Sequence, residues 1–291
     1  MNAVNFTHPF TFTTLTISFL YLTYIYIIRQ RKERKQITPD LQFLSRTTQY
    51  LTLASKKNDR FNYLKAYLER LNYPIQLQRY QHLQQFDTSL CISYSSPIAQ
   101  SKVIVCAYVS SKPTDQHFHG GVAELMEIAR LLKKEQPILP YDIEMTFFIC
   151  KDHTSKRKAA EALAQHYYQN DEEIKLCLLL QPGLQARNTI EKYLLQLQQP
   201  TVIRQDQVLI QGDFSSYFQA KKIQTNIAQH CRISAHIEYL PRRKDHPYYA
   251  FRNTSYPTLI LSDRSSTYHQ QAALQSLYKV TKSLYGIITN L

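Results

Sequence analysis

Apolar residues along positions 37–291 recur with the periods of helices and of strands. Spacings of three and four residues predict helices at 37–56, 60–71, 121–134, 155–169, 214–229 and 271–289. Alternating or continuous apolar runs predict strands at 75–80, 89–94, 102–109, 143–150, 174–180, 208–211, 233–240 and 258–262. The order of these segments predicts an α/β domain with a mixed, mostly parallel central sheet and helices on both faces. Binding sites in such sheets form where the parallel strands end.

Residues 9–28 form an uncharged, mostly apolar segment, long enough to cross a bilayer core of about 30 Å as a helix. A basic stretch follows this segment instead of preceding it, and no small-residue cleavage site stands at its end, which favours a retained anchor over a cleaved signal peptide. We therefore expect an N-terminal tail at 1–8, one transmembrane helix at 9–28, a basic juxtamembrane segment at 29–36 and the α/β domain at 37–291. The positive-inside rule predicts a single-pass protein whose domain lies in the cytoplasm.

The formal net charge of the 291-residue chain is +13. A cluster of basic side chains follows the predicted anchor: Arg29, Arg31, Lys32, Arg34 and Lys35. These residues could contact anionic lipid, so a basic, membrane-proximal module is one function hypothesis. The sequence has no zinc-knuckle spacing and no arginine-rich repeat, and we expect no specific binding of nucleic acid.

The five cysteines do not form any Cys-x-x-Cys pair. Four of them lie inside apolar runs that read as strands. This pattern predicts buried free thiols, which suit a reducing compartment.

A series of short motifs follows the predicted strands in a fixed order. It comprises Tyr108-Val109-Ser110 at the end of a strand, Gly120-Gly121 at the start of a helix, Phe147-Phe148 before Lys151-Asp152, then Asp245-His246 and Tyr268-His269. In order and spacing the series resembles the di-zinc aminopeptidase family, whose relatives include glutaminyl cyclase, the transferrin receptor ectodomain and nicastrin. The resemblance spans about residues 40–289. It implies the aminopeptidase-like, phosphorylase/hydrolase-like three-layer sandwich.

The resemblance also implies that several zinc ligands have been replaced. Tyr108 stands where the family has a zinc-binding histidine, and Ser110 stands where it has the orienting aspartate. A tyrosine hydroxyl titrates near 10, so it is a poor ligand at neutral pH. Lys151 occupies the position of the general base, where an ammonium would repel zinc. Leu180 occupies the position of another ligand, an aspartate, and offers no donor atom.

Other positions of the family pattern keep residues that suit a metal site. Asp152 and His269 remain possible ligands, and His117 falls at the bridging position, or Asp115 if the loop aligns differently. His117 and His119 also fit two solvated loop histidines, which we favour because a specific zinc site needs three or four converging ligands. Tyr268 stands at the position that supports the oxyanion. Asp245 and His246 keep the loop that shapes the family's pocket.

These replacements predict a membrane-anchored, catalytically inactive aminopeptidase-like domain that binds a protein or peptide partner in the old cleft and carries no cofactor. The alternative is a residual hydrolase with one zinc held by His117, Asp152 and His269. Without a general base, hydrolysis would lose a contribution of about 10²–10⁴-fold. Anchored relatives in the family mostly face the lumen or the periplasm, so the resemblance and the positive-inside rule predict opposite sides of the membrane.

Overall fold

The computed structural model describes residues 38–54, 57–82, 85–110, 120–150, 153–181, 207–239, 247–263 and 270–291. Their strands are β1 (Ile75–His82), β2 (Gln85–Tyr94), β3 (Ser101–Ser110), β4 (Tyr141–Cys150), β5 (Ile174–Leu180), β6 (Gln207–Gly212), β7 (Ser234–Tyr239) and β8 (Thr258–Asp263). Their helices are α2 (Leu41–Leu53), α3 (Lys57–Arg70), α4 (Gly120–Glu135), α5 (His153–Gln169), α7 (Tyr217–Asn226), α8 (Tyr248–Arg252) and α9 (Gln270–Asn290), with a 3₁₀ turn η2 (Phe214–Ser216) and a π-helical turn η3 (Ile227–Cys231).

The strands form one mixed sheet in the order β1-β2-β4-β3-β5-β8-β6-β7. The four central strands β4, β3, β5 and β8 run parallel to one another. The pairs β1–β2, β2–β4 and β6–β8 are antiparallel, and β7 pairs with β6 in parallel. The prediction of a mixed, mostly parallel sheet is confirmed. The parallel arrangement brings the carboxyl ends of four strands to one edge.

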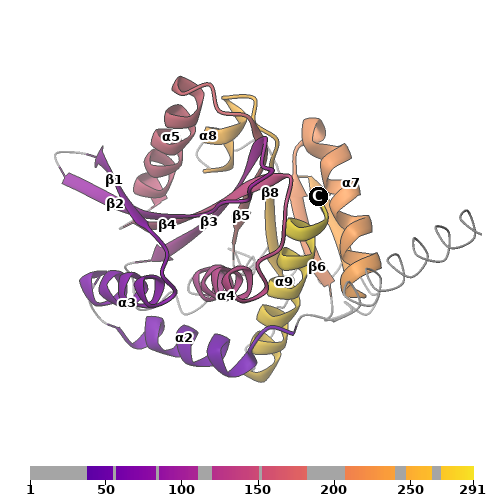
Figure 1. The fold of residues 1–291 in the computed structure, drawn as a ribbon, viewed down its shortest axis with the longest axis horizontal. Coiled ribbons are helices and arrows are strands. Elements are labelled where there is room, and N and C mark those ends of the chain that lie inside the picture. The colour runs from indigo at the N-terminus through magenta and orange to yellow at the C-terminus, as the bar shows by residue number, and fades with distance from the viewer. Residues whose placement is uncertain are drawn as a thin grey trace, which may run out of the picture. The chain divides into compact units, whose positions relative to one another are not determined.

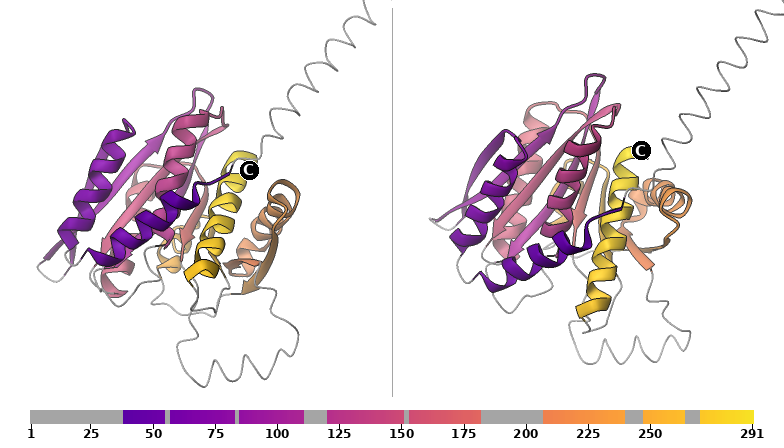
Figure 2. Two further views of the ribbon diagram at one scale, coloured as in Figure 1. Left: turned by 90° about the horizontal axis from the view of Figure 1, so that it is seen from below. Right: turned by 60° about the horizontal axis from the view of Figure 1, so that its bottom comes forward.

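Helices cover both faces of the sheet and make it the middle of three layers (Figure 1). Helices α5 and α8 lie on one face, and α2, α3, α4 and α9 lie on the other, with α7 beside α9 (Figures 1 and 2). The core under α5 and α8 includes buried residues of all four parallel strands, among them Cys106, Phe148, Leu179 and Ile260. On α5, the buried positions Ala159, Ala160, Leu163, Ala164 and Tyr167 give the helical spacing that turns one face toward the sheet.

Helix α4 is buried on nearly all sides, although its sequence pattern predicts an amphipathic helix. Even Glu127 is fully buried. Its carboxylate accepts hydrogen bonds from the Arg130 guanidinium at 2.7 Å and from the backbone N–H of Asp40 at 2.8 Å. These bonds satisfy the buried charge and tie the start of α2 to α4. Asp40 in turn caps α2 by accepting from the backbone N–H groups of Gln42 and Phe43.

Three sequence expectations need correction. The predicted helix at 214–229 is divided into η2, α7 and η3. The short helix α8 lies where the sequence pattern predicts no element. Leu41 and Tyr50 are two of the apolar positions from which the sequence predicts the helix at 37–56, yet they are 44% and 45% exposed. In contrast, all five cysteines are free and buried, which confirms the interpretation of their pattern.

Among the helices of the described residues, none combines the length and apolarity that a membrane span requires. The predicted span at 9–28 lies outside those residues and stays a prediction.

Candidate functional site

The candidate site lies at the edge of the sheet where β3, β4, β5 and β8 end. The register aligns Ala107 of β3 with Leu180 of β5, and Leu180 with Leu261 of β8. Gln181, the next residue after β5, donates its backbone N–H to the Leu261 carbonyl at 3.1 Å. This edge is the one at which the sequence predicts a site.

Most of the predicted site residues lie outside the described part of the chain. They are His117, Lys151, Asp152, Asp245, His246, Tyr268 and His269, together with the alternative Asp115. Their roles stay predictions. The described elements that flank three of these segments, β3, β4 and β8, all end at this edge. The structure places Tyr108, Ser110 and Leu180 directly.

Tyr108 lies near the end of β3 on the face covered by α5. Its ring stacks on Phe148 with centroids 5.0 Å apart, and the Lys156 ammonium lies 5.7 Å from its centroid. The hydroxyl is buried and has no hydrogen-bond partner among the described residues. Burial raises the pKa of the Tyr108 hydroxyl well above its usual value, and the neighbouring Cys106 and Cys150 raise it further. The phenol therefore stays protonated at neutral pH.

Ser110 is the last residue of β3 and pairs with Cys150, the last residue of β4. The Cys150 thiol is fully buried, 3.3 Å from the Tyr80 hydroxyl. The two strands thus end level with each other. A thiol in this buried environment behaves as a small apolar group with one weak hydrogen bond.

Leu180 ends β5 directly beneath the first turn of α4. It is 1% exposed. A Cβ added to Gly121 would lie 3.2 Å from both the Cβ and the carbonyl oxygen of Leu180. The helix approaches the strand this closely because residue 121 has no side chain. The position to which the sequence resemblance assigns an aspartate ligand is therefore apolar, and the start of α4 packs against it.

Lys156 is a residue of this edge that the sequence analysis did not single out. It lies in the first turn of α5, is 7% exposed, and faces the Tyr108 ring. The helical period contains the signal, since Lys156 precedes the buried Ala159 and Ala160 by three and four positions. A cation in an otherwise apolar stripe is the feature that would have identified it. The ammonium adds positive charge to an edge where a zinc site would need anionic or neutral donors.

The described residues do not suit zinc. No group of three or more histidine, cysteine, aspartate or glutamate side chains converges anywhere in the described ranges. At this edge the two positions to which the sequence resemblance assigns zinc ligands hold a protonated phenol and a buried leucine, neither of which is a zinc donor. A zinc site here would depend on residues outside these ranges.

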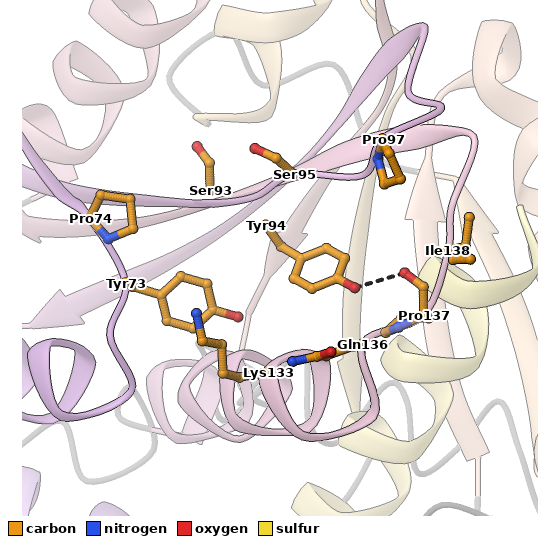
Figure 3. A pocket seen from close by; sticks show the side chains of 10 residues that line it. All are labelled: Tyr73, Pro74, Ser93, Tyr94, Ser95, Pro97, Lys133, Gln136, Pro137 and Ile138. Carbon is orange, nitrogen blue, oxygen red and sulfur yellow. Dashed lines mark hydrogen bonds between the residues drawn. The ribbon is translucent and has the colours of Figure 1, made fainter.

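A separate pocket of about 350 Å³ lies at the opposite edge, between the end of β2 and the end of α4 (Figure 3). Tyr94 donates its hydroxyl to the Pro137 carbonyl at 2.7 Å, and Tyr73 donates to the Ala129 carbonyl at 2.9 Å. The Lys133 ammonium lies 5.1 Å from the centre of the Tyr73 ring. These polar groups are already used in holding the end of α4 against the sheet, so the pocket has a structural explanation.

Solved structures with this fold include zinc-dependent exopeptidases and glutaminyl cyclases. The LapA aminopeptidase of Legionella pneumophila matches with a TM-score of 0.65 at 10% identity, covering 86% of this chain and 71% of its own. A glutaminyl cyclase of Fimbriiglobus ruber matches with a TM-score of 0.61 at 13% identity, covering 88% and 96%. A zinc-dependent exopeptidase of Parabacteroides distasonis matches with a TM-score of 0.59 at 12% identity, covering 88% and 100%.

No family model matches the sequence, and no curated protein matches it either. The fold is aminopeptidase-like. At 10–13% identity these similarities establish the architecture and leave the chemistry to the residues of this chain.

Proposed function

We propose that this chain is a membrane-anchored, catalytically inactive aminopeptidase-like domain that binds a protein or peptide partner at the carboxyl edge of its sheet. The anchor is the segment 9–28. No zinc and no hydrolysis take part in this function.

The observation that carries the proposal is the environment of Leu180. A metal ligand at this position would need a donor atom and open space in front of it. Leu180 has neither, because its side chain is a hydrocarbon and is only 1% exposed. The first turn of α4 approaches the Cβ and the carbonyl of Leu180 closely at Gly121. The position therefore contributes apolar packing.

Tyr108 supports the same conclusion independently. Its ring stacks on Phe148 and its hydroxyl stays protonated, so it contributes packing where the family has a ligand. Lys156 adds a cation beside the ring. Binding needs no general base or Lewis acid, only a shaped edge with a few polar groups, and these residues can supply that.

The first test is the metal content of the full chain, purified in detergent without a histidine tag. After exposure to excess zinc and removal of free metal, we expect less than about 0.1 zinc per chain by mass spectrometry and no shift of the melting temperature with a chelator. About one zinc per chain, lost in Asp152→Ala and His269→Ala, would support the residual hydrolase instead. A peptidase assay of that zinc-loaded chain would then decide whether it is active.

The second test addresses binding at the edge. A photoreactive amino acid at Gln181 should crosslink a partner in the membranes of the native cell, whereas one at the exposed Tyr168 of α5 should not. Equal crosslinking from both positions would point to contact by crowding and would remove the support for the carboxyl edge as the binding surface.

A further inference from the structure

Four aromatic side chains gather on the surface around the start of α7; we call Phe214, Tyr217, Phe218 and Tyr239 the α7 aromatic patch. Phe214 and Phe218 are 83% and 82% exposed, and Tyr239 is 57% exposed. The Tyr217 ring stacks near Tyr239 with centroids 6.3 Å apart, and it meets the Phe218 ring edge-on at 6.0 Å. Phe214 begins the 3₁₀ turn η2, and Phe218 lies in the first turn of α7, which follows directly.

This exposure serves no purpose in the fold itself. The buried residues of α7 are Ala220 and Ile223, which face away from the two phenylalanines. A phenylalanine side chain that is more than four-fifths exposed contributes almost no free energy of burial to folding. Two such neighbours form an apolar surface whose contact with water is unfavourable. A patch of this kind indicates a contact with an apolar phase or partner.

The charges around the patch are positive. Helix α7 contains Lys221 and Lys222 and no acidic residue, and both lysines are exposed. The nearest acidic positions are already engaged: Asp213 forms an ion pair with Arg252, and Glu238 accepts a hydrogen bond from Gln211 at 3.4 Å. Exposed aromatic rings followed by lysines on one helix are typical of surfaces that lie on anionic lipid.

The helix that contains most of the patch shares a neighbour with the first described helix. Helix α9 packs against both α2, the first described helix, and α7 (Figure 2). Ten residue steps separate position 28, the end of the predicted anchor, from Thr38. A chain of ten residues spans at most about 35 Å, so an anchored domain stays within that distance of the bilayer. The tether gives weak lipid contacts a high effective concentration.

We propose that the α7 aromatic patch docks on an anionic lipid surface, with Phe214 and Phe218 entering the headgroup region. Lys221 and Lys222, whose ammonium groups donate to the Gln224 side-chain oxygen at 2.9 Å and to the Leu291 carbonyl at 3.0 Å, then exchange these contacts for lipid phosphates. This contact is separate from the predicted one at the basic segment 29–36, and it orients the domain on the membrane. It does not depend on whether the carboxyl edge of the sheet is catalytic or only binds.

The test uses the absence of tryptophan from the chain. The variant Phe218→Trp places a single fluorophore in the patch, and Tyr168→Trp places one at an exposed position of α5, on the other face of the sheet. Each full-length variant is reconstituted in vesicles of brominated phosphatidylcholine with about 30% phosphatidylserine. Bromine quenches only a fluorophore that reaches the lipid.

We expect the tryptophan of F218W to be quenched at least about twofold more than that of Y168W. The double substitution Lys221→Gln and Lys222→Gln in the F218W chain should reduce this quenching, and so should vesicles without phosphatidylserine. Both predictions follow from attraction between the lysines and lipid phosphates.

Equal quenching of the two variants would overturn the proposal and leave the patch as a surface for a protein. Quenching that is unchanged in neutral vesicles would overturn the role of anionic lipid. Release of the full chain from the vesicles at high salt would also overturn the proposal. The proposal requires that the segment 9–28 anchors the chain and that the short tether keeps the domain near the bilayer. Circular dichroism of each variant verifies folding, and the exposed sites make misfolding a minor risk.

Discussion

Two tyrosines that pack beneath α5, one at each edge of the sheet, differ in the hydrogen bonding of their hydroxyl groups. At the amino edge, Tyr167 of α5 donates its hydroxyl to Glu144 of β4, and Lys102 of β3 lies 4.0 Å from the same carboxylate. Lys102 also pairs with Glu172. At the carboxyl edge, the Tyr108 hydroxyl is buried without a partner in the described residues. Both rings belong to the same core beneath α5.

This difference indicates that the polar groups of the amino edge contribute to stability, whereas the Tyr108 hydroxyl at the carboxyl edge does not. The amino edge forms a connected network in which each charge has a partner, so its loss costs stability. At the carboxyl edge, the Tyr108 hydroxyl has no partner within the described ranges, an arrangement that folding alone does not favour. At the carboxyl edge, the described residues supply apolar packing and the Tyr108 hydroxyl, which takes part in none of their hydrogen bonds.

The largest expected effect comes from placing an acid at the closed end of β5. Leu180→Asp should lower the free energy of unfolding by about 4 kcal/mol, because the carboxyl group would be buried against α4 without a partner. Urea unfolding of the full chain measures it, and Leu180→Met, which conserves volume, should cost less than about 1.5 kcal/mol. If zinc restored the stability of the aspartate variant, the edge would still be a metal site and the comparison of the two edges would fail.

A smaller effect is expected from the amino-edge tyrosine. Tyr167→Phe should cost about 2 kcal/mol, because it removes a hydrogen bond to a carboxylate that is largely buried. The same unfolding measurement applies. A cost near zero would mean that Glu144 finds another donor, and the amino edge would then be no better connected than the carboxyl edge.

The pH dependence of stability should isolate Glu144. Burial raises the pKa of its carboxyl group, and the hydrogen bond from Tyr167 and the charge of Lys102 offset this only in part. A folded-state pKa above the unfolded value near 4.3 means that the contribution of Glu144 to stability is greatest below that pH. This contribution is lost as the pH rises through the raised folded-state pKa, and the loss is about 1.4 kcal/mol for every pH unit that separates the folded and unfolded pKa values. Glu144→Gln should remove this fall, and parallel pH profiles of the two chains would refute the assignment.

The smallest effect is expected at Tyr108. Tyr108→Phe should change the free energy of unfolding by less than about 0.5 kcal/mol or raise it, because the hydroxyl that it removes has no partner to lose among the described residues. Measured beside Tyr167→Phe, it gives a direct contrast of one substitution at two edges. A loss as large as that at Tyr167 would reveal a partner for the hydroxyl and end the contrast.

Elements with a strong period were predicted closely. The strand expected at 174–180 coincides with β5, because a continuous apolar run in a covered sheet allows little else. Helix α8 was missed because five residues are too few to show a period. Its buried tyrosines belong to the core on one face of the sheet, so tertiary packing stabilises this short helix. At the candidate site, the sequence located Tyr108, Ser110 and Leu180 at strand ends. The helical period on α5 indicates that Lys156 lies on the buried face, but only the structure places it beside the Tyr108 ring.

The sequence by itself determined the order of strands and helices, the covered central strands and the edge where they end, because these follow from local periodicity and from the geometry of parallel sheets. Only the tertiary structure decided that α4 packs on Leu180, that Glu127 is buried while it pairs with the partly exposed Arg130, and that Phe214 and Phe218 stay exposed. The burial of a side chain depends on contacts with segments far away in the chain. The pattern of apolar residues within one helix contains no information about those contacts.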